Sequence, residues 1–254
     1  MIKRAFFAAL LSAATAAHAA SDRNPPPPGA FAGAPAQYTQ FTTRELMRGF
    51  LALAFGSDLR LGVRPKGVRR FDRNITAFVS SDASVDRKAA MEQIVAEYGE
   101  VSANLKISPA AEEDDADLVI HLIDEGKFKD ALIDAFGATV ADAFVRRTDP
   151  QCMTSVKSRG DGVILRSVSF VIADQGDKVF LDCAYHEMLH ALGLSNHDQS
   201  NPWTTLNQRR MVGYLTVYDR TLLKALYDPR IEPGTSRQQI RRVLPQVIRG
   251  IKGK

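Results

Sequence analysis

The sequence predicts a mixed α/β domain in which helices pack on a sheet. Helical and strand-like hydrophobic patterns alternate along the chain, and residues 118–123 are apolar on both faces, as a central strand requires. The 254 residues are 45% hydrophobic and 24% charged. These fractions are ordinary for a globular protein and exclude a collagen-like repeat, a disulfide-dense miniprotein and a wholly disordered chain.

Residues 1–20 have the pattern of a cleaved secretory signal peptide. Lys3 and Arg4 precede an apolar run that ends in small residues. The run is too short and too rich in alanine to span a membrane, and no other stretch approaches that length. We therefore expect a periplasmic or secreted protein. Residues 21–38 are rich in proline, glycine and alanine, which predicts an extended linker, and residues 39–254 are expected to form a single domain.

The first half of that domain is predicted to contain two helices and two strands. Thr42 and Glu45 form a capping box, and apolar side chains then recur at helical spacing until Gly56, which is expected to take the left-handed cap. Residues 70–80 alternate between apolar and polar, which indicates a strand. Ser84 is expected to cap the second helix, and the central strand follows.

The second half is predicted to add further helices and one strand. Apolar side chains step by four residues from Leu132 to Phe144, which predicts one helix. Residues 163–173 are β-branched and alternate, as in a strand, and residues 178–192 are again helical in pattern. This order of elements favours a mixed sheet with helices packed on it.

Three of the five histidines fall within twelve residues, and this concentration predicts a metal site. His186 and His190 are four residues apart on a predicted helix, so both imidazoles can reach one ion. Glu187 can address a metal-bound water without ligating the ion. Gly193 can adopt the positive φ that turns the chain back toward the helix, so that a later residue supplies a third ligand. Three protein ligands and a water are typical of catalytic zinc.

The third ligand is one of Asn196, His197 and Asp198. His197 is favoured because neutral imidazole is a better zinc ligand than an amide, and a loop can absorb one residue of slip. Asp198 can instead orient a ligand imidazole. The alternative is an ordinary helix with surface or core histidines, which would hold no metal.

This pattern predicts a zinc-dependent metallopeptidase that acts on a peptide or protein. Zinc lowers the pKa of a bound water from about 15.7 to roughly 7 and polarises the substrate carbonyl, while Glu187 takes the proton as general base and later passes it to the leaving amine. Two other functions remain open: a non-catalytic binding or scaffold protein that retains the peptidase fold, and a domain in which zinc is purely structural.

His186, Glu187, His190 and Gly193 resemble the HExxHxxGxx pattern, followed by His or Asp, of the metzincin class of zinc peptidases. The resemblance implies a metzincin-like mixed sheet with the HExxH motif on the active-site helix. This chain departs from the class in two ways. Asn196 stands at the in-register position of the third ligand, with His197 one residue later, and Leu206 stands where the class has methionine.

The chain is also similar to a proteobacterial family of exported proteins and lipoproteins, the domain of unknown function 2927. The similarity covers about residues 40–250 and includes Cys183, the turn at Gly193 with Asn196, and residues 218–234. Members of that family often lack the two histidines, so the resemblance implies a metallopeptidase-like fold more firmly than it implies activity. This chain keeps both histidines.

Cys152 and Cys183 are the only cysteines, and in an exported chain they are predicted to form a disulfide. The alternative is that Cys183, three residues before His186, is a metal ligand or an inhibitory thiolate.

Residues 237–254 predict a basic amphipathic C-terminal helix. They carry six Lys and Arg and no acid, although the net charge of the whole chain is only +4. The body without its two ends is therefore acidic, which argues against a nucleic-acid partner. The apolar face of the helix is expected to dock on the body; the alternative is an anionic membrane surface. The sequence indicates no oligomeric state.

Overall fold

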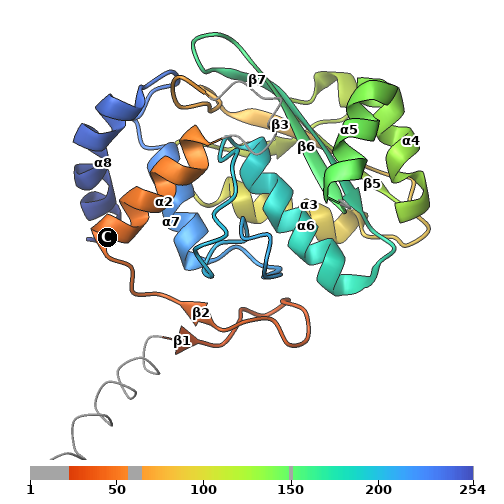
Figure 1. Cartoon of the computed structure of the whole chain (residues 1–254), viewed down its shortest axis with the longest axis horizontal. Coiled ribbons are helices and arrows are strands. Elements are labelled where there is room, and N and C mark those ends of the chain that lie inside the picture. Colours follow the sequence, from red (N-terminus) through yellow and green to blue (C-terminus); the bar gives the residue numbers. More distant parts are fainter. Residues whose placement is uncertain (1–22, 57–64, 149–150, 254) are drawn as a thin grey trace, which may run out of the picture.

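The computed structural model describes residues 23–56, 65–148 and 151–253, so the predicted signal peptide lies outside the described residues. The described chain contains a five-stranded mixed sheet in the order β4-β3-β5-β7-β6 (Figure 1). The first four strands of that order are parallel and β6 is an antiparallel edge strand. The predicted mixed α/β class is confirmed. The strands are β3 (Ile75–Ser81), β4 (Ile107–Pro109), β5 (Leu118–Ile123), β6 (Cys152–Ser158) and β7 (Ile164–Ile172).

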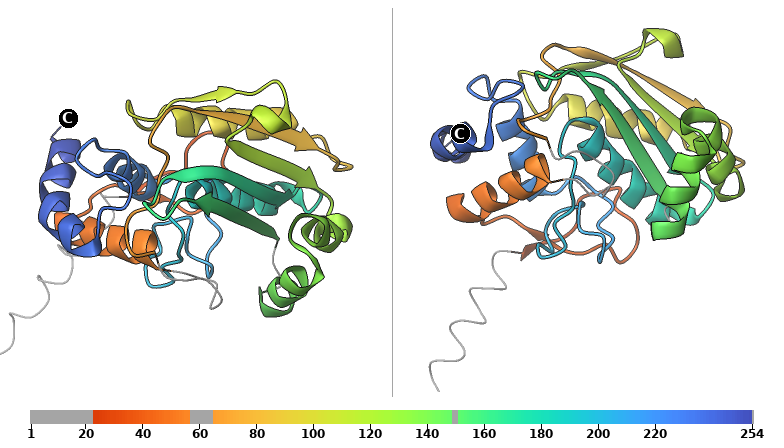
Figure 2. Two further views of the ribbon diagram at one scale, coloured as in Figure 1. Left: turned by 90° about the horizontal axis from the view of Figure 1, so that it is seen from above. Right: turned by 45° about the horizontal axis from the view of Figure 1, so that its top comes forward.

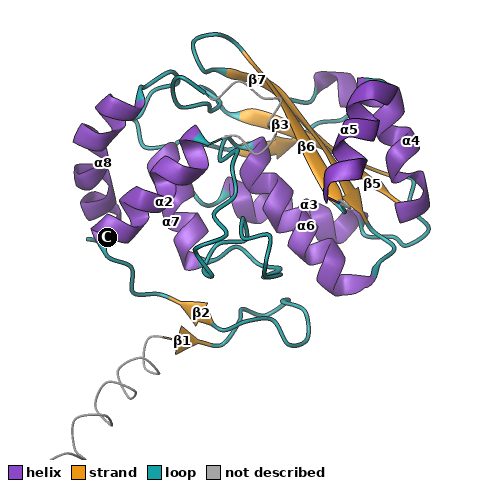
Figure 3. Cartoon of the chain, viewed as in Figure 1, coloured by secondary structure: helices purple, strands orange, loops and turns teal. Residues whose placement is uncertain are grey.

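Helices cover both faces of this sheet, which explains the continuous apolar run of β5. Helices α3 (Lys88–Gly99) and α6 (Gly176–Ala191) pack on one face, where Ile120 belongs to the large core (Figure 3). Helices α4 (Glu125–Phe136) and α5 (Ala138–Thr148) form a smaller cluster with Ile123 on the other face.

A second group of helices lies at the end of the sheet away from α4 and α5 (Figure 2). It consists of α2 (Thr43–Phe55), α7 (Val217–Leu226) and α8 (Arg237–Lys252). The apolar side chains of α8, among them Ile240 and Leu244, are fully buried, and α8 packs against α2 and α7. The predicted docking is confirmed, and this face is not available to a membrane. None of the helices in the described ranges has the length and apolarity to cross a bilayer.

The structure differs from the expected extended linker over residues 21–38. Near the two ends of this segment the backbone pairs as two short antiparallel strands, β1 (Arg23–Asn24) and β2 (Gln37–Tyr38). These residues flank the prolines and keep the backbone N–H groups that pairing needs. Phe31 is buried, and the ring of Tyr38 stacks on Trp203 with centroids 4.9 Å apart. The segment therefore packs on the loop that follows α6.

Three predictions about where helices begin, end or continue are wrong. Gly56 has φ −83° and ends α2 in an extended rather than a left-handed conformation. Ser84 does not cap α3, which begins after Arg87, because the backbone and hydroxyl of Ser84 donate to Asp124 (2.8 and 2.9 Å). The single helix expected through residues 132–144 is two helices, α4 and α5, because Gly137 takes φ +81°.

Candidate metal centre

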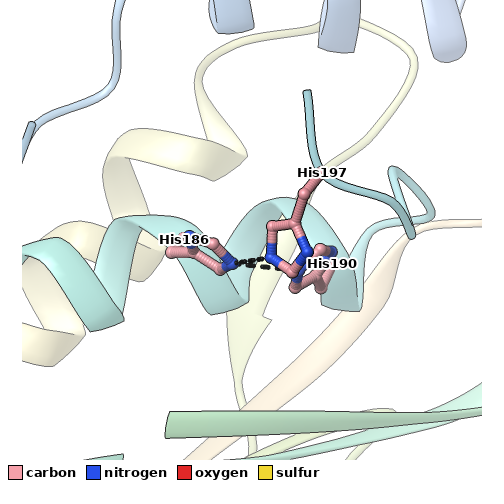
Figure 4. A group of neighbouring side chains, drawn as sticks. All are labelled: His186, His190 and His197. Carbon is pink, nitrogen blue, oxygen red and sulfur yellow. Dashed lines mark hydrogen bonds between the residues drawn. The ribbon is translucent and has the colours of Figure 1, made fainter. Parts of the chain in front are cut away.

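His186, Glu187 and His190 lie on α6, and the chain turns back immediately after this helix. Gly193 has φ +115°, as expected, and its N–H donates to the carbonyl of His190 (3.0 Å). The helix therefore ends in a left-handed turn. The loop that follows brings His197 over the helix, where its ring faces the other two imidazoles (Figure 4).

The turn at Gly193 has no room for a side chain. A Cβ there would lie 2.1 Å from the backbone oxygen of Arg69, in a conformation that L-residues rarely adopt. We expect Gly193→Ala to lower the free energy of unfolding by about 1–3 kcal/mol, measured by urea denaturation. Gly126→Ala is the control, because a Cβ at that helical position meets nothing within 4 Å and should be neutral or slightly stabilising. Equal stability of the two variants would contradict the prediction.

The three imidazoles converge on one point. The Nε2 atom of His186 lies 3.0 Å from that of His190 and 2.7 Å from that of His197, and the remaining Nε2 pair is 3.2 Å apart. A tetrahedral zinc ion, bound at about 2.0–2.1 Å, holds its ligand nitrogens roughly 3.3 Å apart. The separations are therefore close to those that a shared ion requires.

Backbone carbonyls fix the tautomers of two of these rings. The Nδ1 atom of His186 lies 2.9 Å from the carbonyl oxygen of Thr205, and Nδ1 of His190 lies 2.7 Å from that of Leu194. A carbonyl oxygen only accepts, so each Nδ1 carries the proton of a neutral ring. Burial lowers the pKa of His186 to about 3 and those of His190 and His197 to about 4. Unprotonated Nε2 lone pairs of His186 and His190 therefore face each other, an arrangement that a cation between them stabilises.

Glu187 supplies a buried carboxyl group beside this cluster. Its exposed fraction is 4%, and among the described residues its Oε2 atom has no hydrogen-bond partner. Burial raises its pKa to about 8, against the opposing effect of a hydrogen bond from Thr154 on β6. A buried carboxyl oxygen without a partner is costly unless another molecule satisfies it, and a bound water would do so.

The structure separates the three candidates for the third ligand. Only His197 joins His186 and His190 in the described cluster of convergent ligand atoms. The side-chain amide of Asn196 instead donates to the carbonyl of Ala52 on α2 (3.0 Å). The carboxylate of Asp198 accepts hydrogen bonds from the backbone and hydroxyl of Ser200 (3.1 and 2.5 Å).

A buried aspartate on α7 holds the loop that positions His186. Asp219 accepts hydrogen bonds from the hydroxyls of Thr204 (2.5 Å) and Thr216 (2.9 Å) and from the backbone N–H of Thr205 (2.8 Å). The carbonyl of Thr205 is the acceptor for His186. Asp219 lies in the stretch of family similarity, but the sequence predicted no role for it; the local signal was its position three residues after Thr216, which is a helix-capping spacing.

The site lies within a stretch that matches a protein-family model. The model described as "Protein of unknown function (DUF2927)" matches residues 43–246, from the start of α2 into α8. The chain belongs to the DUF2927 family. The family predicted from the sequence is thus confirmed. None of the curated proteins compared with this DUF2927 chain matches it.

The DUF2927 chain contains the predicted disulfide. Cys152, the first residue of β6, is bonded to Cys183 on α6, and no cysteine is free. This pairing excludes Cys183 as a thiolate ligand. The bond joins the edge strand to the helix one turn before His186.

We expect removal of this disulfide to lower the stability of the DUF2927 domain markedly. The bond closes a loop with a sequence separation of 31, for which chain entropy gives about 3–4 kcal/mol. The Cys152→Ser/Cys183→Ser variant should therefore unfold at a lower urea concentration than the oxidised wild type. Wild type unfolded in the presence of a reductant should have the same urea midpoint as the variant. A variant with the same urea midpoint as the oxidised wild type would contradict the expectation.

A pocket opens beside the loop of the DUF2927 domain that carries His197. Its volume is about 270 Å³, and its lining includes Glu45, Arg48, Asp198, Trp203 and Tyr218. Trp203 is the only tryptophan of the chain. Its fluorescence can therefore report on binding in this pocket.

Proposed function

We propose that this DUF2927 protein is an exported zinc-dependent metallopeptidase. The observation that carries the proposal is the convergence of three neutral imidazoles on one point, with the Nε2 lone pairs of His186 and His190 directed inward. The resemblance of the HExxHxxG sequence to metzincins supports a peptidase among zinc enzymes. The signal-like sequence of residues 1–20 and the disulfide support export.

His186, His190 and His197 would hold the ion, and the donor set fits zinc. Imidazole is a common zinc ligand, and three protein donors leave a coordination position for water or substrate, whereas a structural zinc site has four protein donors. When bound, zinc lowers the pKa of water and polarises a peptide carbonyl. The carbonyls of Thr205 and Leu194 keep two rings in the tautomer and orientation that binding needs.

Glu187 is the group that moves the proton. Its carboxylate accepts a proton from the attacking water and delivers it to the nitrogen of the leaving amine. Burial raises the pKa of this carboxyl group, and the positive charge of a bound ion would oppose that effect and favour the carboxylate that takes the proton. The unpartnered Oε2 atom is the acceptor available to that water.

The chain departs from metzincins at Leu206, which stands where that class has methionine. Leu206 is fully buried, and its carbonyl accepts from the backbone N–H of Asp198 (3.0 Å). The loop is thereby held just after His197 by a backbone hydrogen bond that does not depend on the side chain at position 206. This substitution therefore leaves the proposed ligand set intact.

Metal analysis combined with peptide hydrolysis tests the proposal. We expect about one equivalent of zinc in the purified protein and cleavage of a peptide library that a chelator abolishes and added zinc restores. Stoichiometric zinc without cleavage of any peptide would favour the scaffold protein instead. Absence of metal binding would overturn both the metal site and the peptidase.

A further inference from the structure

Helix α8 carries a strongly basic face, which consists of Arg237, Arg241, Arg242, Arg249 and Lys252. All five side chains are exposed, and the helix contains no acidic residue. Its apolar side chains are buried in the large core, where the helix packs on α2 and α7. Figures 1 and 2 show α8 along the outer edge of the molecule, at the end opposite α4 and α5. The basic face therefore lies on an outer end of the protein.

Several arginines elsewhere on the surface are paired with acids, whereas those of the basic face are not. Four of the paired arginines each lie 2.5–2.8 Å from an aspartate: Arg73, Arg87, Arg159 and Arg230. On α8, Arg241, Arg242 and Arg249 form no ion pair with any described residue. A run of cations with no acid among them produces a positive potential that reaches about 8–10 Å into solvent at moderate ionic strength. The basic face is therefore suited to an anionic partner.

The shape and setting of the basic face favour an extended anionic surface as that partner. The face follows a single helix of 16 residues, which is about 24 Å long. Residues 21–236 carry a net negative charge, so an anionic surface would attract the α8 end more strongly than the rest of the protein and would orient it. The predicted export places the protein beside a phospholipid bilayer rather than beside nucleic acid.

We propose that the basic face of α8 binds the anionic phospholipid headgroups of a bilayer. The binding is electrostatic and peripheral, because the apolar side of the helix is buried in the protein and does not enter the lipid. Each Lys or Arg close to an anionic membrane strengthens binding about fivefold, so five of them give firm but reversible attachment. The inference goes beyond the proposed peptidase and does not depend on it, since α8 supplies no residue to the three-histidine cluster.

Sedimentation with lipid vesicles tests the inference. The protein is prepared without residues 1–20, because an uncleaved signal peptide would itself bind lipid. We expect it to sediment with vesicles of phosphatidylcholine and phosphatidylglycerol and to stay in solution with vesicles of phosphatidylcholine alone. Raising the salt from about 0.01 M to about 1 M shortens the Debye length from about 30 Å to about 3 Å and should release the protein. Binding that persists at high salt, or that is equal on both vesicles, would overturn the inference.

The variant Arg241→Gln/Arg242→Gln/Arg249→Gln should bind the anionic vesicles about a hundredfold more weakly than wild type, because it loses three cations of the basic face. Lysine at the same three positions should restore the affinity, since a charged surface responds to the charge and not to the planar guanidinium. Because all three side chains are exposed, each variant should unfold at the wild-type temperature.

A second triple variant separates the basic face from net charge. Lys88→Gln/Lys106→Gln/Lys157→Gln also removes three exposed cations, on α3, just before β4 and on β6. It should keep an affinity close to that of wild type. Equal losses in the two glutamine variants would show that net charge alone decides the binding and would overturn the role of α8. Binding to a short DNA duplex without binding to the anionic vesicles would assign the basic face to nucleic acid and would also overturn the inference.

Discussion

Glu187→Gln is expected to lower the kcat of peptide hydrolysis by about 10²–10⁴-fold while zinc stays bound. Glutamine has nearly the shape of glutamate, but its amide cannot take a proton from water. The carboxyl group of Glu187 is buried, so solvent does not readily replace the lost base. Steady-state kinetics gives kcat, and metal analysis of the same sample confirms that the zinc content is unchanged.

Glu92→Gln is the matched control for this variant, because Glu92 is exposed on α3. It should keep the wild-type rate. Glu187→Gln should also keep a stability close to that of wild type, since an uncharged amide of nearly the same shape replaces the buried carboxyl group. A wild-type kcat in Glu187→Gln would assign the proton transfer to another group and would refute the mechanism.

His197→Ala is expected to abolish stable zinc binding. Structural zinc sites with four ligands are worth about 10–16 kcal/mol, so one ligand of three contributes about 3 kcal/mol or more, which is over a hundredfold in affinity. In wild type, zinc at a thousand times its Kd should add about 4 kcal/mol to the free energy of unfolding. Calorimetric titration measures the affinity, and thermal unfolding with and without zinc measures this stabilisation.

The flanking residues provide the controls that identify the third ligand. Asn196→Ala should keep zinc and lose only the hydrogen bond to Ala52, at a cost of about 1 kcal/mol of stability. Asp198→Ala should likewise keep zinc, because the carboxylate of Asp198 bonds Ser200. Loss of zinc in Asn196→Ala, together with its retention in His197→Ala, would show that the ligand is the in-register residue.

The sequence predicted the parts of the site that depend on local geometry. Helical spacing places His186 and His190 one turn apart whatever surrounds them, and Gly193 was identified because a left-handed turn excludes most other residues. Neighbouring residues do not determine which of residues 196–198 turns inward. That depends on the path of the loop, which Asp219 and Leu206 fix from elsewhere in the fold.

The same distinction applies to the fold. The strongly apolar β5 and the capping box of α2 were predicted, because burial on two faces and a cap are visible in a few residues. The edge strand β6 was not, since it has few apolar side chains and pairs through its backbone with β7. The break at Gly137 was also missed. Apolar side chains recur every four residues on both sides of it, but the positive φ of Gly137 separates two helices.

The packing of the proline-rich segment affects how the protein should be prepared. The family match begins at residue 43, which makes that position an attractive start for a recombinant fragment. Such a fragment would lack Tyr38, whose ring covers Trp203, and Pro35, whose carbonyl accepts the hydroxyl proton of Tyr214 (2.7 Å). Both contacts fall on the loop between His197 and α7. We therefore expect a trimmed fragment to hold the proposed zinc ion less firmly even with every histidine in place.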